Sequence, residues 1–152
     1  MYIPLQNRSQ SGRLAGVYKL VSASSSVESA DPHQLIQLLF ESLQETLLKA
    51  MGALQRGDMA TKAQALGLAT RLIDEGLKAS LEHRSGDAQA DALSAKLALV
   101  YDYASMRLTL ANLRNDTGLV EEVRRILAPV SSAWGEISSM AKPSTALNMR
   151  EA

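Results

Sequence analysis

Apolar residues recur every three or four positions through most of this chain, and this spacing predicts amphipathic helices. In the first such segment the spacing begins after Asp31 and stops at Gly57, with apolar positions at Leu35, Leu38, Leu39, Leu43, Leu47, Met51 and Leu54. Asp31 is a good N-cap, Pro32 suits the first helical position, and Gln34 completes a capping box. Gly57 is typical of the left-handed residue that ends a helix.

Three further segments show the same spacing. The second follows Asp58 and stops at Gly86, the third begins after Asp87, and the fourth covers about 119–140. Each helix would contain ~22 to 27 residues and extend over ~33 to 40 Å. Long helices that are joined by short links must run antiparallel. The predicted fold class is therefore all-α, an antiparallel up-down four-helix bundle with an N-terminal arm.

The two ends of the chain depart from this pattern. Residues 1–30 are rich in Ser and Gly, so we expect an arm and linker there, then the bundle over 31–140 and a flexible tail over 141–152. Composition agrees with a helical bundle, because Leu occurs 24 times and Ala 22 times, whereas Val, Ile and Thr together occur 18 times. Leu and Ala favour helices, while β-branched residues favour strands.

Charge and residue chemistry narrow the range of functions. Sixteen basic residues balance sixteen acidic ones, so the chain has no net field to draw it to nucleic acid or an anionic membrane. Cysteine is absent and histidine occurs twice, which leaves few ways to build a metal site or a thiol catalyst. The glycine-rich and metalloprotease motifs of common enzymes are also missing. We therefore expect no enzyme activity, cofactor, metal, nucleic-acid partner or membrane partner.

The same composition predicts a location. No apolar run in the sequence reaches the length of a signal peptide or of a membrane span. The absence of cysteine also fits the reducing cytoplasm. We expect a cytosolic protein.

One alternative of a different class concerns histidine. A four-helix bundle with an exposed helical histidine can act as a phosphotransfer module, and His83, near the end of the predicted second helix, is the better candidate. The other interpretation of His83 is a cation that is favourable at a helix C-terminus.

The predicted third helix has two apolar rows. Its first row includes Leu97, Tyr101, Ala104 and Leu108, and its second consists of Leu99, Tyr103, Met106 and Leu110. Together they cover more of the helix than a core-facing stripe needs. The first helix also has a wide apolar band, because three residues lie off its main row: Ile36, Phe40 and Leu48. Either the core is broad, with some of these residues half exposed, or they form an outward groove for an amphipathic partner helix.

Two glycines interrupt the predicted second helix. Gly67 and Gly76 each cost ~1 kcal/mol relative to alanine in a helix interior. Each is either a tolerated defect or a point where another element approaches the backbone closely.

Several blocks of the chain, taken in order, resemble the flagellar secretion chaperone family, FliS. They are Tyr18, Val27–Ile36 with its Asp-Pro-His-Gln core, Leu39-Phe40, Ile73–Ala79, Tyr101-Asp102-Tyr103, Ala111–Asp116, Glu121–Val123 and Ala133-Trp134. The block Ala111–Asp116, which reads Ala-Asn-Leu-Arg-Asn-Asp, is the most specific of them.

The resemblance implies a four-helix bundle with an N-terminal arm, and it implies an export chaperone. The implied client is the C-terminal segment of flagellin, which would be held in the cytoplasm and delivered to a component of the flagellar type III export gate. Holding this segment would prevent premature polymerisation. An exposed client groove can also make the empty chaperone self-associate weakly.

We assign client or partner binding to eight residues, by this resemblance and by the apolar rows: Tyr18, Ile36, Phe40, Tyr101, Tyr103, Arg107, Asn112 and Asn115. Tyr18 either lies near the client groove or anchors the arm to the bundle. Residues two apart point to different sides of a helix, so one of Tyr101 and Tyr103 is expected in the core and the other near the groove. Arg107 either meets acidic client residues or is solvated. The amides of Asn112 and Asn115 could bond an incoming backbone, although we favour capping of the fourth helix for Asn115.

Overall fold

The computed structural model describes residues 31–82 and 86–141, with side chains to residue 137. The predicted arm, the predicted tail beyond Ala141, and the two candidate residues Tyr18 and His83 lie outside this part of the chain. The described elements are α2 (Pro32–Arg56), α3 (Met59–Arg71), η2 (Leu72–Lys78), η3 (Ala79–Glu82), α4 (Ala88–Arg114) and α5 (Thr117–Ala141).

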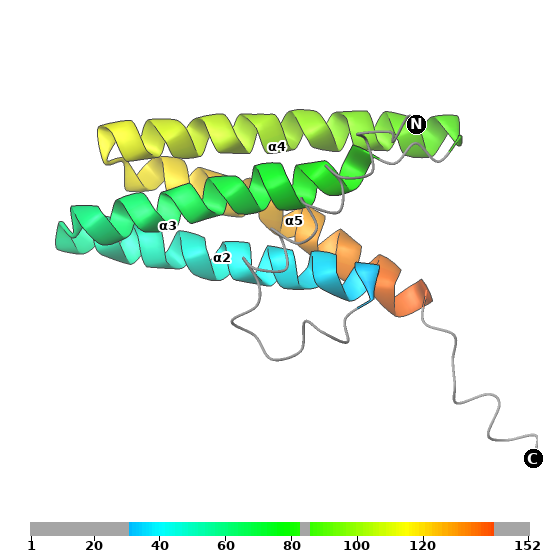
Figure 1. The fold of residues 1–152 in the computed structure, drawn as a ribbon, viewed down its shortest axis with the longest axis horizontal. Helices are drawn as coiled ribbons and strands as arrows, with labels where there is room; N and C mark the ends of the chain where they lie inside the picture. The colour runs from blue at the N-terminus through cyan, green and yellow to red at the C-terminus, as the bar shows by residue number, and fades with distance from the viewer. Residues whose placement is uncertain (1–30, 83–85, 142–152) are drawn as a thin grey trace, which may run out of the picture.

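The four long segments run antiparallel, as Figure 1 shows, so the predicted all-α bundle is confirmed for the described residues. α3 and its continuation η2 pack against both α2 and α4, and α5 packs against the same two helices. As a result, α2 and α4 lie diagonally across the core.

The helix ends form where the capping residues predict. The Asp31 carboxylate accepts a hydrogen bond from the Gln34 amide at 2.8 Å, and the Gln34 side chain accepts one from the Asp31 amide at 3.3 Å. Asp58 and Asp87 cap α3 and α4 through their side-chain oxygens. Gly57 ends α2 with φ 71°, a left-handed conformation that glycine adopts without strain.

The turn between α4 and α5 differs from the prediction. Asn115 ends α4 in the left-handed conformation, with φ 52°, and Asp116 caps α5 by accepting a hydrogen bond from the Gly118 amide at 2.9 Å. The expected capping role of Asn115 is therefore wrong. Its side-chain oxygen instead accepts a hydrogen bond at 2.7 Å from the Lys62 ammonium group, which also donates to the Asn112 carbonyl at 3.0 Å. Lys62 is buried, so it ties α3 to the end of α4 from within the fold.

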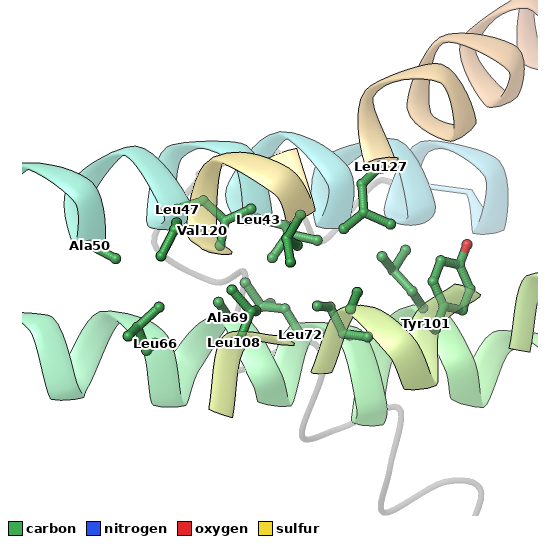
Figure 2. Close-up of a cluster of buried hydrophobic side chains, with 14 of the residues drawn as sticks. Leu43, Leu47, Ala50, Leu66, Ala69, Leu72, Tyr101, Leu108, Val120 and Leu127 are labelled. Atoms are coloured by element: carbon green, nitrogen blue, oxygen red, sulfur yellow. The ribbon is translucent and has the colours of Figure 1, made fainter. Parts of the chain in front are cut away.

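The core is a continuous column of aliphatic side chains between the helices (Figure 2). Its members come from every long helix and include Leu43, Leu47, Leu66, Leu72, Leu108, Val120 and Leu127. At one end of the bundle, the Trp134 ring stacks on His33 with centroids 5.1 Å apart, and its indole nitrogen donates to the His33 carbonyl. Trp134 therefore fastens α5 to the first turn of α2.

The segment after α3 departs from a regular α-helix. Leu72–Lys78 forms a π-helix and Ala79–Glu82 forms a 3₁₀ turn. Gly76 lies in this stretch, and a Cβ placed on it would lie 3.1 Å from the Cδ2 atom of buried Leu39. Gly76 is thus a point of close approach between α2 and η2. No atom comes within 4 Å of a Cβ placed on Gly67, so Gly67 is a tolerated defect.

Candidate partner-binding face on α4

α4 is apolar on two opposite sides, and only one of them faces the core. Tyr101, Ala104, Leu108 and Ala111 are buried inside the bundle. Large apolar side chains remain exposed on the opposite side, with exposed fractions of 70% for Leu99, 51% for Met106 and 80% for Leu113. We call Leu99, Tyr103, Met106, Leu110 and Leu113 the outer stripe.

The spacing of the outer stripe is that of a helix-pairing seam. Leu99, Met106 and Leu113 follow one another at intervals of seven residues, and Tyr103 and Leu110 fall between them. Alternating steps of four and three residues keep one row of side chains along one side of a helix, which is the pattern used when two helices pair. The outer stripe therefore has the spacing of a helix-pairing surface, and in the described part of the chain all of its members except the half-buried Leu110 are exposed.

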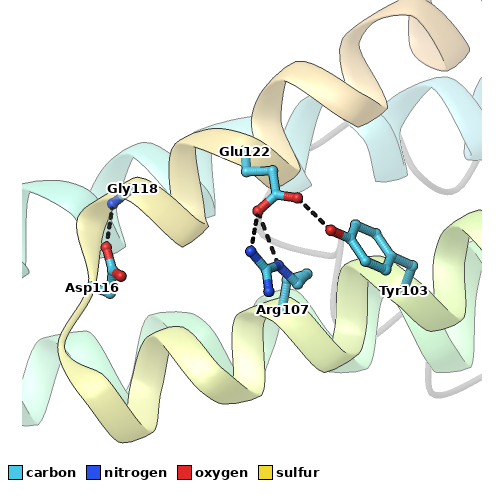
Figure 3. Close-up of polar contacts among 5 residues, drawn as sticks. All are labelled: Tyr103, Arg107, Asp116, Gly118 and Glu122. Carbon is cyan, nitrogen blue, oxygen red and sulfur yellow. Dashed lines mark hydrogen bonds and ion pairs between the residues drawn. The ribbon is translucent and has the colours of Figure 1, made fainter.

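Polar contacts to α5 border one side of the outer stripe (Figure 3). The Tyr103 hydroxyl donates to Glu122 Oε1 at 2.5 Å, and Arg107 donates through Nε and Nη2 to Glu122 Oε2 at 2.9 and 2.7 Å. The Arg107 guanidinium also lies 5.6 Å from the centroid of the Tyr103 ring. Glu122 thus fixes the orientation of two predicted binding residues.

Polar contacts to η2 border the other side. Lys78 forms an ion pair with Asp102 at 2.6 Å, and the Ser105 hydroxyl donates to Asp74 at 2.7 Å. These contacts hold α4 against its neighbours on both sides, so the outer stripe is presented on a fixed helix.

The structure separates the predicted binding residues into three groups. Tyr103 and Arg107 lie at the outer stripe, and Asn112 is exposed in the last turn of α4. Phe40 and Tyr101 are 1% and 3% exposed and belong to the core, so the assignment of a partner contact to them does not fit this state of the protein. Ile36 is half-buried on α2, against the core, and Asn115 is in the α4–α5 turn.

Two contributors to this face, Glu122 and Leu113, were neither among the predicted binding residues nor in the predicted apolar rows. Glu122 organises Tyr103 and Arg107, and only tertiary contact between α4 and α5 reveals this role. Leu113 is the most exposed member of the outer stripe. The sequence could have placed Leu113 in the same row as Met106, because an interval of seven residues returns to the same side of a helix.

The electrostatics of this cluster have identifiable causes. The hydrogen bonds from Tyr103 and Arg107 lower the pKa of Glu122 below its ordinary value, and the bond to Glu122 raises the pKa of Tyr103. Burial raises the pKa of Tyr101 to about 12. All three groups therefore keep their ordinary charge at neutral pH.

The lowered pKa of Glu122 makes a prediction about acid stability. A carboxylate whose pKa is lower in the folded state stabilises the fold above its unfolded pKa, and this contribution is lost as the pH falls through the folded pKa. Between about pH 7 and about pH 3, the Tm of the wild-type chain should therefore fall further than that of Glu122→Gln. Glu45→Gln removes an exposed carboxylate from α2 and serves as the control. Thermal unfolding followed by circular dichroism measures all three, and equal losses of Tm in the three proteins would contradict the prediction.

Two further findings concern metal binding and membrane crossing by the described residues. They contain no group of three or more His, Cys, Asp or Glu side chains that could hold a metal ion. Among the helices that the structure describes, none combines the length and the hydropathy needed to cross a lipid bilayer.

The described fold and the outer stripe define an all-α bundle with an exposed apolar row at heptad spacing on α4. Residues 15–141 match the family described as "Flagellar protein FliS", and the chain belongs to this family. Over 124 residues it is 44% identical to the flagellar secretion chaperone FliS of Salmonella typhimurium, covering 82% of this chain and 89% of the relative.

More distant relatives carry the same kind of name. The chain is 38% identical to the flagellar secretion chaperone FliSB of Pseudomonas aeruginosa, over 80% of this chain and 92% of the relative. It is 32% identical to the flagellar secretion chaperone FliS of Bacillus subtilis, over 72% and 77% of the two chains.

Proposed function

We propose that this protein is a cytoplasmic export chaperone that binds the C-terminal segment of flagellin. Binding would prevent premature polymerisation and deliver the client to a component of the flagellar type III export gate. The family and the relatives named above support the chaperone function. The single observation that supports a helix as the bound form is the exposed outer stripe of α4, with its heptad spacing.

The physical reason for this binding is the exposed apolar surface of the unassembled client. An amphipathic segment that will later pair with its own kind has an apolar side that must be hidden until then. The outer stripe offers a matching apolar row on a helix that is already folded. The client loses conformational entropy when it folds on this surface, and this cost keeps the affinity moderate for the area covered, so that release is feasible.

The proposal has two further parts, which concern the N-terminal arm and the chaperone without its client. Tyr18 belongs to the arm, and its proposed role is client handling near the groove. Without client, the outer stripes of two chains can pair weakly, because each is a seam with an apolar row. The phosphotransfer alternative, centred on His83, has no observation in the described residues that favours it.

The proposal is tested by co-expressing the chain with full-length flagellin and with flagellin that lacks its C-terminal segment. The chain should capture the first and fail to capture the second, because the truncated client has no segment to fold on α4. Size-exclusion chromatography of the purified chain with each client gives the same comparison at known concentrations. Equal capture of both clients would place the binding segment elsewhere, and capture of neither would contradict the chaperone function.

A further inference from the structure

A cleft lies beside the N-terminal half of α4. It has a volume of about 950 Å³ and is bounded by η2 and η3 on one side and by α4 on the other. Ala92, Ala95, Ala98 and Leu81 contribute apolar surface to it. Ala92 and Ala95 precede Leu99 by seven and four positions, so the surface of the cleft continues into the outer stripe.

The residue sizes along this continuous surface change at Leu99. Toward the C-terminus of α4 the surface is made of leucine and methionine, which project from the helix. Toward the N-terminus it is made of alanine, whose short side chain lets another backbone come close. A helix lying along the whole of α4 would therefore pack on the projecting side chains of the outer stripe and approach the α4 backbone more closely over the cleft.

The cleft is also strongly charged for a protein with no net charge. Among the described residues that line it are four carboxylates, Asp74, Glu75, Glu82 and Asp91, and one cation, Lys78. The ammonium group of Lys78 is 2.6 Å from Asp102, and the Glu75 carboxylate is 3.4 Å from the Arg71 guanidinium group. With these two partners counted, five carboxylates and two cations of the described residues lie at the cleft, so its formal charge is negative, whereas the side chains of the outer stripe are uncharged.

We infer that the segment docked on α4 is an amphipathic helix with Lys or Arg residues over the cleft and apolar residues over the outer stripe. This inference rests on the proposed function, because it concerns the same face of α4. It adds that charge fixes where along α4 the helix lies. An apolar seam alone permits slips by one heptad, whereas a basic stretch is stabilised only beside the acidic walls.

The test uses two synthetic peptides of about three heptads, both with leucine at the seam positions. One carries lysine at the flanking positions and the other carries glutamate. Fluorescence anisotropy with the full chain should show that the lysine peptide binds about tenfold more tightly at low salt. The difference should shrink at about 0.5 M salt, where the Debye length falls to a few ångströms.

Charge reversal in the cleft identifies the groups responsible. Glu75→Lys with Glu82→Lys should abolish or invert the preference for the lysine peptide. Glu41→Lys with Glu45→Lys makes the same change in net charge on α2, diagonally across the bundle, and should leave most of the preference intact. Glu75→Gln with Glu82→Gln should give an intermediate preference, and it keeps the test decisive if the reversed variant folds poorly.

Equal affinity of the two peptides for the wild-type chain would overturn the inference and leave the proposed function standing. An equal loss of preference in the cleft variant and the α2 variant would also overturn it, since net charge alone would then explain the effect. If neither peptide binds, or if Met106→Glu weakens neither, the outer stripe is not the docking face and the proposed binding mode fails as well.

Discussion

Met106→Glu is expected to weaken binding of the flagellin C-terminal segment by about 30-fold or more, without lowering the stability of the free chain. Met106 lies in the middle of the outer stripe and is 51% exposed, so a carboxylate there remains solvated in the free protein. In the complex the same carboxylate would be covered by an apolar side chain and would lose its water without gaining a partner. Burying an unpaired charge in this way is far more costly than losing one apolar contact.

The matched control is Ile137→Glu. Ile137 on α5 is also 51% exposed, so the substitution removes the same kind of apolar surface and adds the same charge away from α4. Isothermal titration with the C-terminal segment should show nearly wild-type affinity for this control. Circular dichroism should show the same Tm for both variants. Equal affinities of the two variants would remove the outer stripe from the binding mechanism.

Leu108→Ala is expected to lower the free energy of unfolding by about 3 kcal/mol, within a usual range of about 2 to 5 kcal/mol for a buried leucine. Leu108 is fully buried and lies among core residues of several helices (Figure 2). The substitution leaves a cavity that the surrounding helices fill only in part. Such a loss is a large fraction of the total stability of a domain of this size, which is about 5 to 15 kcal/mol.

Leu113→Ala on the same helix provides the contrast. Leu113 is 80% exposed, so its truncation removes little buried surface and should change the free energy of unfolding by less than about 0.5 kcal/mol. Urea unfolding followed by circular dichroism measures both variants. A large loss of stability in Leu113→Ala, or none in Leu108→Ala, would mean that the two sides of α4 have been assigned the wrong way round.

The boundaries of the helices could be predicted from the sequence because they depend on local chemistry. Asp31, Asp58 and Asp87 cap the helices that follow them, and Gly57 ends α2, with no help from distant residues. The α4–α5 turn was harder, because Asn115 and Asp116 are both good capping residues. A distant residue, Lys62, distinguishes them, since its ammonium group binds the Asn115 side chain.

The burial of individual apolar residues depends on the angle between rows on a helix. Leu99 and Leu108 are nine positions apart, which is about half a turn around an α-helix, so they cannot both face the core. Phe40 is three positions before Leu43, and the two therefore lie on adjacent rows that merge into one buried band. The sequence shows both patterns as two apolar rows. On α2, Phe40 is buried, Ile36 is half-buried and Leu48 is 51% exposed, whereas the outward row of α4 leaves Leu99, Tyr103 and Met106 exposed.

Features that require contact between helices were beyond the reach of the sequence. The role of Glu122 depends on α5 lying beside Tyr103 and Arg107. The π-helix at Leu72–Lys78 and the cleft next to it depend on how η2 packs against α2 and α4. Helical periodicity assumes a regular helix and therefore cannot reveal a change of helix type.

Under the proposed function, the outer stripe would also set the stoichiometry of this protein. In the described part of the chain, one helix carries one seam, and a docked segment covers it until the segment leaves. Each copy of the proposed chaperone would then protect one client molecule, and a cell that makes more client than chaperone would leave the excess client unbound. Such a chaperone would act by occupancy rather than by turnover, so its abundance relative to the client would determine how much client is protected.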